Sequence, residues 1–133
     1  MKQYLFLLLS LAGLATSAQT AIGLDQQALK QWSIGTANFS GITKIDDTRY
    51  AVVSDKEPRD GFFLFHIYQD PQSGEISSVL REGFKGNPHP ATDGDGNSLR
   101  DCEGIAYRPS SKTFFISGEG DQKVLEYDMN GVP

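Results

Sequence analysis

The sequence predicts an all-β chain built from a repeated strand–turn–strand unit, and three observations support this. First, similar segments recur at a fixed spacing: 63 residues separate Gly41 from Gly104, and 63 separate Ser54 from Ser117. Second, β-branched and aromatic residues gather in short runs bounded by Gly, Pro, Asn and Asp. Third, no segment after the N-terminal stretch has the 3.6-residue periodicity of an amphipathic helix. Fixed-period similarity marks repeat architectures, and four-stranded repeats without helices are typical of β-propeller blades.

The first repeat is expected to contain four strands. The turn at Asp46-Asp47 joins the first two, a polar loop around Pro58 leads to the third, and a turn over 71–74 leads to the fourth. The strands are predicted over residues 41–45, 49–54, 62–68 and 76–81. Before them, residues 28–34 alternate loosely between apolar and polar side chains, which predicts an isolated edge strand.

The second repeat follows residues 83–100, which are rich in Gly and Pro and predict a long surface loop. Its strands are predicted over residues 104–108, 113–117 and 123–127, followed by an Asn130-Gly131 turn. A propeller closes with about four to eight blades, so the chain is expected to be an incomplete segment of about two blades. Missing C-terminal blades or further copies are therefore expected as partners. A small β-sandwich is the alternative, but it does not explain the repeat.

The N-terminal residues predict a signal peptide. Lys2 is followed by an apolar run over residues 5–15 and by small residues up to Ala18, and this run is too short to span a bilayer. The expected organisation is a signal over 1–18, a flexible leader over 19–27 and the β domain over 28–133. The protein is therefore expected to be secreted or periplasmic, with no membrane insertion of the mature chain.

Charge and cysteine content narrow the function further. The formal net charge is −5, and no basic cluster is present, which argues against nucleic acid and anionic membranes as partners. The single cysteine, Cys102, cannot form an internal disulfide. It lies between Asp101 and Glu103, so a small buried apolar side chain is expected rather than an activated thiol.

Acidic residues form the strongest candidate site. Asp101 and Glu103 are two residues apart at a strand start and are expected to point the same way, and Glu119 and Asp121 are spaced likewise. Asp55 is the comparable acid of the first repeat. Converging carboxylates bind hard cations such as Ca²⁺, or act as an acid–base pair. The alternative is that these acids only satisfy backbone N–H groups at turns.

Two further features are weaker candidates. Arg100 lies beside Asp101, and the bidentate fit of guanidinium to phosphate makes it the preferred substrate-binding residue among the basic side chains. The other basic candidates are Lys56, Arg59 and Arg81. Residues 93–97 alternate Asp and Gly like the opening of a Ca²⁺ loop, but Ser98 replaces the expected glycine, so a solvated turn is favoured.

Several segments together resemble the esterase-like (phytase-like) domain family of exported bacterial β-propellers. The resembling segments are Ser40-Gly41-Ile42, Tyr50-Ala51-Val52-Val53-Ser54-Asp55, Asp101-Cys102-Glu103-Gly104-Ile105-Ala106-Tyr107 and Ser117-Gly118-Glu119. The resemblance covers residues 28–133 and only the N-terminal part of such a domain. It implies phosphoester hydrolysis by Asp55, Asp101, Glu103 and Glu119. The first repeat departs from the pattern, because Asn38-Phe39-Ser40 replaces Asp101-Cys102-Glu103.

Two functions follow as hypotheses. One is a hydrolase of small phosphoesters that uses carboxylates and possible bound Ca²⁺; no Gly-x-Ser-x-Gly motif is present to support a serine nucleophile. The other is a non-catalytic propeller module for binding or scaffolding, in which the acids hold a structural Ca²⁺ or the geometry between blades. Other hydrolases of the same fold remain open, because fold does not determine chemistry.

Overall fold

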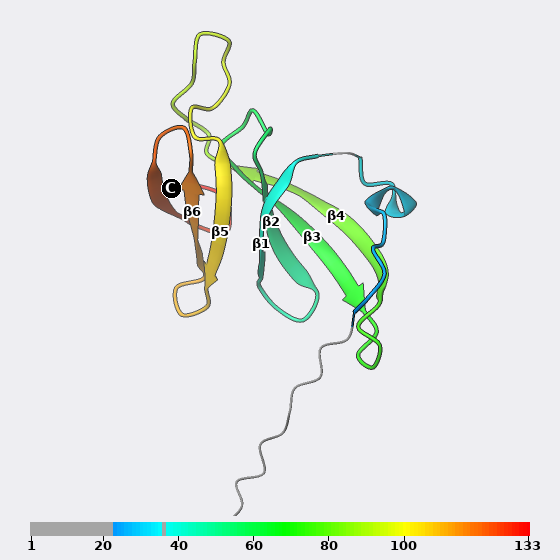
Figure 1. Ribbon diagram of the computed structural model, residues 1–133. Helices are drawn as coiled ribbons and strands as arrows, with labels where there is room; N and C mark the ends of the chain where they lie inside the picture. Colours follow the sequence, from blue (N-terminus) through cyan, green and yellow to red (C-terminus); the bar gives the residue numbers. More distant parts are fainter. Residues whose placement is uncertain (1–22, 36) are drawn as a thin grey trace, which may run out of the picture.

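The computed structural model describes residues 23–35 and 37–133 and is all-β apart from one short 3₁₀ turn (Figure 1). A four-stranded antiparallel sheet has the order β1-β2-β3-β4, and a three-stranded antiparallel sheet has the order β5-β6-β7. The strands are β1 (Phe39–Lys44), β2 (Arg49–Ser54), β3 (Gly61–Gln69), β4 (Ile76–Gly86), β5 (Cys102–Arg108), β6 (Thr113–Gly118) and β7 (Lys123–Tyr127). The predicted all-β class is confirmed, and each of the seven strands predicted within the two repeats is present.

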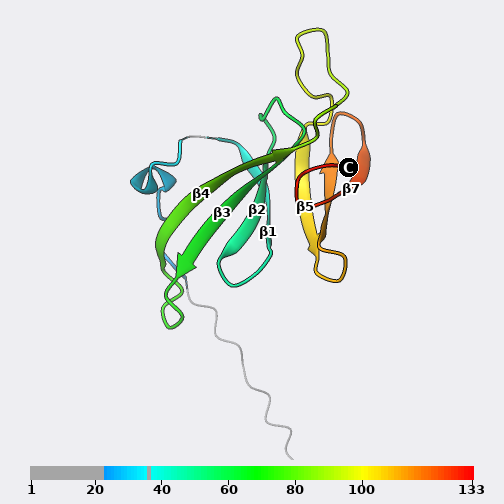
Figure 2. The ribbon, with the colours of Figure 1, turned by 180° about the vertical axis from the view of Figure 1, so that it is seen from behind.

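The two sheets lie side by side, with β1 next to β5 in both views (Figures 1 and 2). Ser40 Oγ donates a hydrogen bond to the carbonyl of Cys102 (3.0 Å), and Tyr107 N donates to Thr43 Oγ1 (3.1 Å). Both contacts advance along the two strands in the same direction, so β1 and β5 run parallel. Their backbones approach closely at Gly41, where an added Cβ would lie 2.9 Å from the carbonyl oxygen of Glu103.

The main core lies between the two sheets. Its buried members are Ala51, Val53, Phe62, Leu64, Cys102, Phe114, Ile116 and Tyr127. Alternate residues of a strand point to opposite faces, so the intervening residues of β2 and β3 lie on the far face of the four-stranded sheet. There a second cluster contains Ile34, Val52, Phe63, Phe65 and Val79. The four-stranded sheet is therefore apolar on both faces.

The registers show how the two repeats correspond. Ile42 of β1 lies opposite Val52, and Ile105 of β5 lies opposite Ile116, so Val52 and Ile116 are equivalent. Val52 belongs to the far-face cluster, whereas Ile116 belongs to the core between the sheets. The three-stranded sheet therefore packs against the four-stranded sheet through one face, and the equivalent face of the four-stranded sheet is its far face. This head-to-tail stacking is expected of successive propeller blades and agrees with the predicted propeller-like segment.

The sequence alignment of the repeats is correct for the first strand and wrong by one residue for the second. Gly41 lies opposite Val53, but Gly104 lies opposite Ser117, so Ser117 is equivalent to Val53 and not to Ser54. The reason is the turn. The first hairpin closes with a hydrogen bond from Ile45 N to the carbonyl of Arg49, whereas the second has one more residue in its turn. Asp55 and Glu119 consequently occupy equivalent positions after their strands.

The edge strand predicted over residues 28–34 is wrong. Residues Leu29–Trp32 form a 3₁₀ turn that ends at Ser33, whose φ is 58°. Trp32 and Ile34 nevertheless pack on the far-face cluster, as their shared face in the alternating pattern predicted. Ile34 is buried and Trp32 is partly buried, although neither residue pairs with a strand.

The loop predicted over residues 83–100 also starts later than expected, because β4 continues to Gly86. Gly61 lies opposite Gly86 at the end of the β3–β4 ladder. Gly61 has a φ of 151°, and an added Cβ would lie 2.1 Å from the carbonyl oxygen of Lys85. Glycine at this point lets the two backbones pair closely. Because glycine has no side chain, the alternation of apolar and polar residues could not predict this part of β4.

The predicted signal peptide lies outside the described residues. At the end of the predicted leader, Gln27 exchanges two side-chain hydrogen bonds of 2.9 Å with the backbone of Ile76. Within residues 23–35 and 37–133, no helix has the length and apolar character needed to cross a membrane.

Candidate functional site

The predicted acids lie at the end of the sheets where β2 ends, β5 begins and β6 ends, which is the upper end in Figure 1. Asp55 directly follows β2, Asp101 directly precedes β5, and Glu119 directly follows β6. Glu103 is the second residue of β5. Because β1 and β5 are neighbours, this end combines acids from both repeats.

Three of these acids form a compact cluster. One carboxylate oxygen from each of Asp101, Glu103 and Glu119 lies within 4.8 Å of the other two. Asp101 has a φ of 50°, a left-handed conformation that Asp tolerates better than most residues. Its carbonyl accepts a hydrogen bond from Glu119 N (3.0 Å), which ties the start of β5 to the end of β6. The predicted convergence of these carboxylates is present in the structure.

Asp55 lies on the first-repeat side of the cluster. Asp55 N donates a hydrogen bond of 2.9 Å to the carbonyl of Asn38, which repeats the Glu119–Asp101 contact in the first unit. The pKa of Glu103 is raised above its usual value by desolvation, then by the negative charges of Asp55, Asp101 and Glu119. Asp55 is therefore close enough to act electrostatically on the cluster.

Two carboxylate oxygens at this end lack partners. Oδ1 of Asp55 and Oδ1 of Asp101 are buried and accept no hydrogen bond from the described residues. A buried carboxylate oxygen without a donor is costly, which favours an additional positive group there. Lys56 supplies one: its Nζ lies 3.3 Å from Asp55 Oδ2, and its pKa is raised by this hydrogen bond.

The cluster has dimensions that fit a hard cation. Ca²⁺ binds oxygen ligands at about 2.3–2.6 Å, so two ligand atoms of one ion lie up to about 5 Å apart. The 4.8 Å limit for Asp101, Glu103 and Glu119 falls within this range. Carboxylate oxygens are also the ligands that Ca²⁺ prefers. The residues present therefore fit a divalent cation.

A hollow of about 240 Å³ opens beside the cluster. Asp55, Lys56 and Asp101 line it on the cluster side. The remaining lining residues are Glu57, Pro58, Asn97 and Ser98, from the loops after β2 and before β5. A small substrate in this hollow would contact both the acids and the Lys56 ammonium group.

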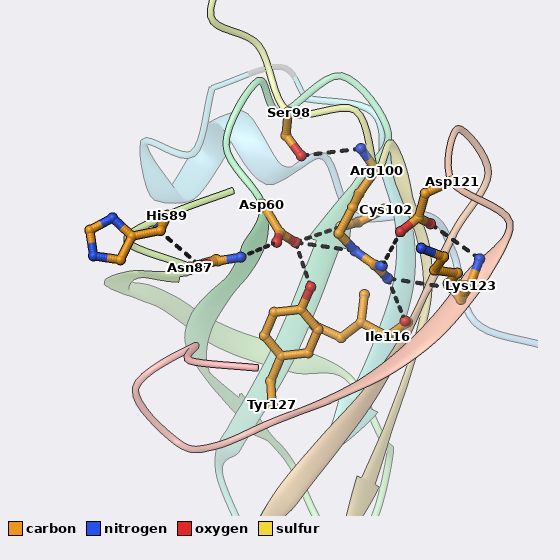
Figure 3. A network of polar contacts seen from close by, with 10 residues as sticks. All are labelled: Asp60, Asn87, His89, Ser98, Arg100, Cys102, Ile116, Asp121, Lys123 and Tyr127. Carbon is orange, nitrogen blue, oxygen red and sulfur yellow. Dashed lines mark hydrogen bonds and ion pairs between the residues drawn. The ribbon is translucent and has the colours of Figure 1, made fainter. Parts of the chain in front are cut away.

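Asp121 and Arg100 lie apart from the three-carboxylate cluster. Arg100 is 4% exposed, and its Nη1 lies 2.6 Å from Asp121 Oδ2 (Figure 3). Asp121 Oδ1 accepts a hydrogen bond from Lys123 N (3.1 Å), so both oxygens of Asp121 are engaged. The guanidinium of Arg100 also donates to the carbonyl of Ile116 (2.7 Å). These contacts bury the guanidinium of Arg100 and engage both carboxylate oxygens of Asp121, so neither side chain is free for a cation or a substrate in this structure.

Asp60 is a residue that the sequence did not single out. It is 1% exposed and lies at the centre of a buried polar network (Figure 3). Tyr127 donates a hydrogen bond to its Oδ1 (2.6 Å), Asn87 donates to its Oδ2 (3.0 Å), and Arg100 Nε lies 3.3 Å from Oδ1. Burial, with the hydrogen bond to Asp60, raises the pKa of Tyr127. In the sequence Asp60 is one of several charges in a polar loop, and no local pattern marks it as buried.

The Asp93–Asn97 segment is a closed turn. Asp93 Oδ1 accepts hydrogen bonds of 2.9 Å from the backbone N–H groups of Asp95 and Asn97. Its Oδ2 accepts one from the Asn97 side chain (3.2 Å), and these donors lower the pKa of Asp93. Asp93 therefore stabilises its own loop, which agrees with the solvated turn predicted for residues 93–97.

Fold and site together define a class: an all-β protein of head-to-tail repeats with an acidic cluster at one end of its sheets. The chain belongs to the phytase-like family, described as "esterase-like activity of phytase", whose model matches residues 34–133. The comparisons found no match among curated proteins and none among solved structures. The family therefore rests on the model match, and it agrees with the resemblance seen in the sequence.

Proposed function

We propose that the protein hydrolyses small phosphoesters with the aid of a divalent cation, with Ca²⁺ as the first candidate. The observation that carries the proposal is the convergence of carboxylate oxygens from Asp101, Glu103 and Glu119 within 4.8 Å of one another. Two observations support it: desolvation and the neighbouring carboxylates raise the pKa of Glu103, and the buried Oδ1 of Asp101 has no hydrogen-bond donor among the described residues. A bound cation would offset both. Membership of a family described by its esterase-like activity supports the same reaction class.

The acidic residues would bind the cation, and Lys56 would orient the substrate. Asp101, Glu103 and Glu119 would hold the cation, and Asp55 would keep the Lys56 ammonium group at the edge of the hollow. Bound there, the cation would neutralise phosphate oxygens and lower the pKa of a coordinated water. Lys56 would orient a phosphate oxygen as a point charge. The nearby hollow has room for the phosphoester group.

The direct test is hydrolysis of bis(p-nitrophenyl) phosphate and p-nitrophenyl phosphate by the full chain, with and without added Ca²⁺. We expect Ca²⁺-dependent turnover that falls by about a hundredfold or more in Glu103→Gln and Glu119→Gln, because each variant loses an anionic ligand. Glu75→Gln is the matched control, since Glu75 is an exposed acid before β4. Equal turnover by all four proteins would exclude the acidic cluster as the catalytic site.

We keep a structural role for the same cation as the second candidate. The specific observation is that the cluster joins two segments: Asp101 and Glu103 lie at the start of β5, one just before it and one within it, while Glu119 follows β6. An ion there would fix these segments to each other without any reaction. Ca²⁺-dependent stability without turnover would favour this binding or scaffold module over the hydrolase.

We also propose that the protein is exported. The apolar run over residues 5–15, followed by small residues before Gln19, supports a cleavable signal. Expression of the full coding sequence in a bacterial host should give a secreted or periplasmic product whose intact mass corresponds to a chain starting at Gln19. A cytoplasmic product that retains Met1–Ala18 would contradict export by this route.

A further inference from the structure

The turn over residues 118–121 carries Glu119, the cluster acid that follows β6. Two backbone hydrogen bonds of 3.0 Å tie this turn to the segment at the start of β5. Glu119 N donates to the carbonyl of Asp101, and Gly120 N donates to the carbonyl of Arg100. The separation of the cluster carboxylates therefore depends on how the turn is held against the start of β5.

The side chain of Arg100 holds the same turn from the interior (Figure 3). Its Nη1 lies 2.6 Å from Asp121 Oδ2, and its Nη2 donates to the carbonyls of Ile116 (2.7 Å) and Lys123 (3.4 Å). The guanidinium thus contacts β6, the turn that follows it and β7. Because Arg100 is buried and Asp121 is partly buried, solvent ions screen this pair less than a surface pair.

The turn packs closely against Arg100 on both sides of Glu119. An added Cβ at Gly118 would lie 2.5 Å from Asp121 Oδ1 and 2.7 Å from the carbonyl oxygen of Arg100. An added Cβ at Gly120 would meet the carbonyl oxygen of Leu99. A change in the Arg100–Asp121 contact would therefore displace the backbone that carries Glu119.

We propose that Arg100 and Asp121 are positioning residues of the acidic site. Their buried ion pair fixes the distance between the carboxylate of Glu119 and those of Asp101 and Glu103, and thereby determines the affinity for the cation. The inference rests on the proposed function, in which these three carboxylates bind the cation. Neither positioning residue would contact the ion. Groups that orient metal ligands typically change metal affinity by about 10- to 100-fold when they are substituted.

The charge of Arg100 distinguishes positioning from a long-range electrostatic effect. A guanidinium repels a nearby cation, so removing its charge would tighten cation binding if charge alone mattered. Loss of positioning would weaken cation binding instead. Gly118→Ala separates the two effects in another way, because it disturbs the contact between the turn and Arg100 without any change of charge.

The test is isothermal titration of the full chain with Ca²⁺ at constant ionic strength. We expect Arg100→Gln, Asp121→Asn and Gly118→Ala each to weaken Ca²⁺ binding by about tenfold or more. The double variant of Arg100→Gln and Asp121→Asn should bind no more weakly than the weaker single variant, because both substitutions break one contact. Thermal melting in chelator shows which variants fold. If Arg100→Gln does not fold, Gly118→Ala and Asp121→Asn decide the question.

Two control variants are matched to these substitutions. Asp128→Asn removes one negative charge from a similar turn after β7, where Asp128 Oδ1 accepts hydrogen bonds from Asn130 N (2.8 Å) and Val132 N (2.9 Å). Gly94→Ala adds a Cβ to a turn where nothing lies within 4 Å of it. Both controls should bind Ca²⁺ as tightly as the parent protein.

Failure of this inference is separable from failure of the proposed function. Weaker Ca²⁺ binding in the three variants, with unchanged binding in the controls, supports positioning even if no phosphoester is hydrolysed. Binding that is lost in Glu103→Gln but unchanged in Asp121→Asn and Gly118→Ala would overturn positioning and leave the cation site in place. Tighter binding in Arg100→Gln would also overturn it, by reducing the pair to a long-range charge effect. Absence of saturable Ca²⁺ binding by the parent protein would overturn both.

Discussion

At the residue scale, the acidic cluster combines three negative charges in a small volume. Folding raises the pKa of Glu103 through desolvation and through Asp55, Asp101 and Glu119. The folded state therefore favours protonated Glu103. Its stabilising contribution is complete below the unfolded-state pKa and is lost as the pH rises through the higher folded-state pKa. At neutral pH without a cation, the ionised Glu103 opposes folding.

This charge balance predicts opposite effects of one substitution. In chelator at pH 7, Glu103→Gln should melt at the same temperature as the parent protein or higher, because it removes a repelled charge. In millimolar Ca²⁺ the parent should gain melting temperature and the variant should gain less, since ligand binding to the folded state stabilises it by mass action. Scanning calorimetry with Glu75→Gln as control measures both. Identical Ca²⁺ responses in the three proteins would argue against cation binding by Glu103.

The sequence predicted the members of the cluster better than their surroundings. Asp101, Glu103 and Glu119 come together as expected from their positions at strand ends. Arg100 was expected to face a substrate because it adjoins Asp101, yet its side chain lies in the interior with Asp60. Neighbouring residues at a left-handed position can point in opposite directions, and the long-range partner Asp60 cannot be read from local spacing.

At the element scale, close contact between β1 and β5 positions the cluster. Gly41 permits it, because a Cβ there would lie 2.9 Å from Glu103 O and 3.1 Å from Gly104 Cα. Gly41→Ala should therefore cost about 1–3 kcal/mol of unfolding free energy by overpacking and should weaken Ca²⁺ binding. Gly35→Ala is the matched control, since a Cβ at Gly35 meets nothing within 4 Å. Urea denaturation checks both, and equal stability of the two variants would refute this role of Gly41.

The strands themselves were largely predictable, because β-branched and aromatic runs between turn residues are local signals. The 49–54 and 123–127 predictions match β2 and β7 at both ends. The errors in the predicted strands arise where tertiary packing, rather than local sequence, determines the backbone conformation. Ile34 is buried and Trp32 partly buried at the end of a 3₁₀ turn rather than in a strand. The glycines of β4 pair in a ladder although their sequence resembles a loop.

At the scale of the whole molecule, the head-to-tail stacking leaves apolar surface on the far face of the four-stranded sheet. A wholly apolar hollow of about 200 Å³ lies there, and Ile42 at its edge is 58% exposed. In the interface between the sheets, the equivalent face of the three-stranded sheet is covered by the repeat that precedes it. We therefore propose that a further repeat sheet, from additional blades or another copy, covers the far face.

The 133-residue chain should consequently self-associate with increasing concentration. Ile42→Lys should reduce the association, because it places a charge in the apolar face. Leu99→Lys is the control, since Leu99 is similarly exposed (48%) but lies in the loop before β5. Sedimentation velocity over a concentration series gives the mass distribution. A monomer at all concentrations, or equal effects of both substitutions, would contradict coverage by another copy.

The buried Asp60 network also determines how the protein loses its structure. Asp60 precedes β3, whereas Tyr127 ends β7 and Arg100 binds the carbonyl of Ile116 in β6. Separating the two sheets would therefore leave a carboxylate and a guanidinium without each other. Such a separation costs several kcal/mol, which makes a state with one intact sheet and one melted sheet poorly populated. Amide protons in the centres of β2 and β6 should therefore exchange with solvent through the same global opening, with closely similar protection. Although built from repeats, these two units open as a single cooperative body.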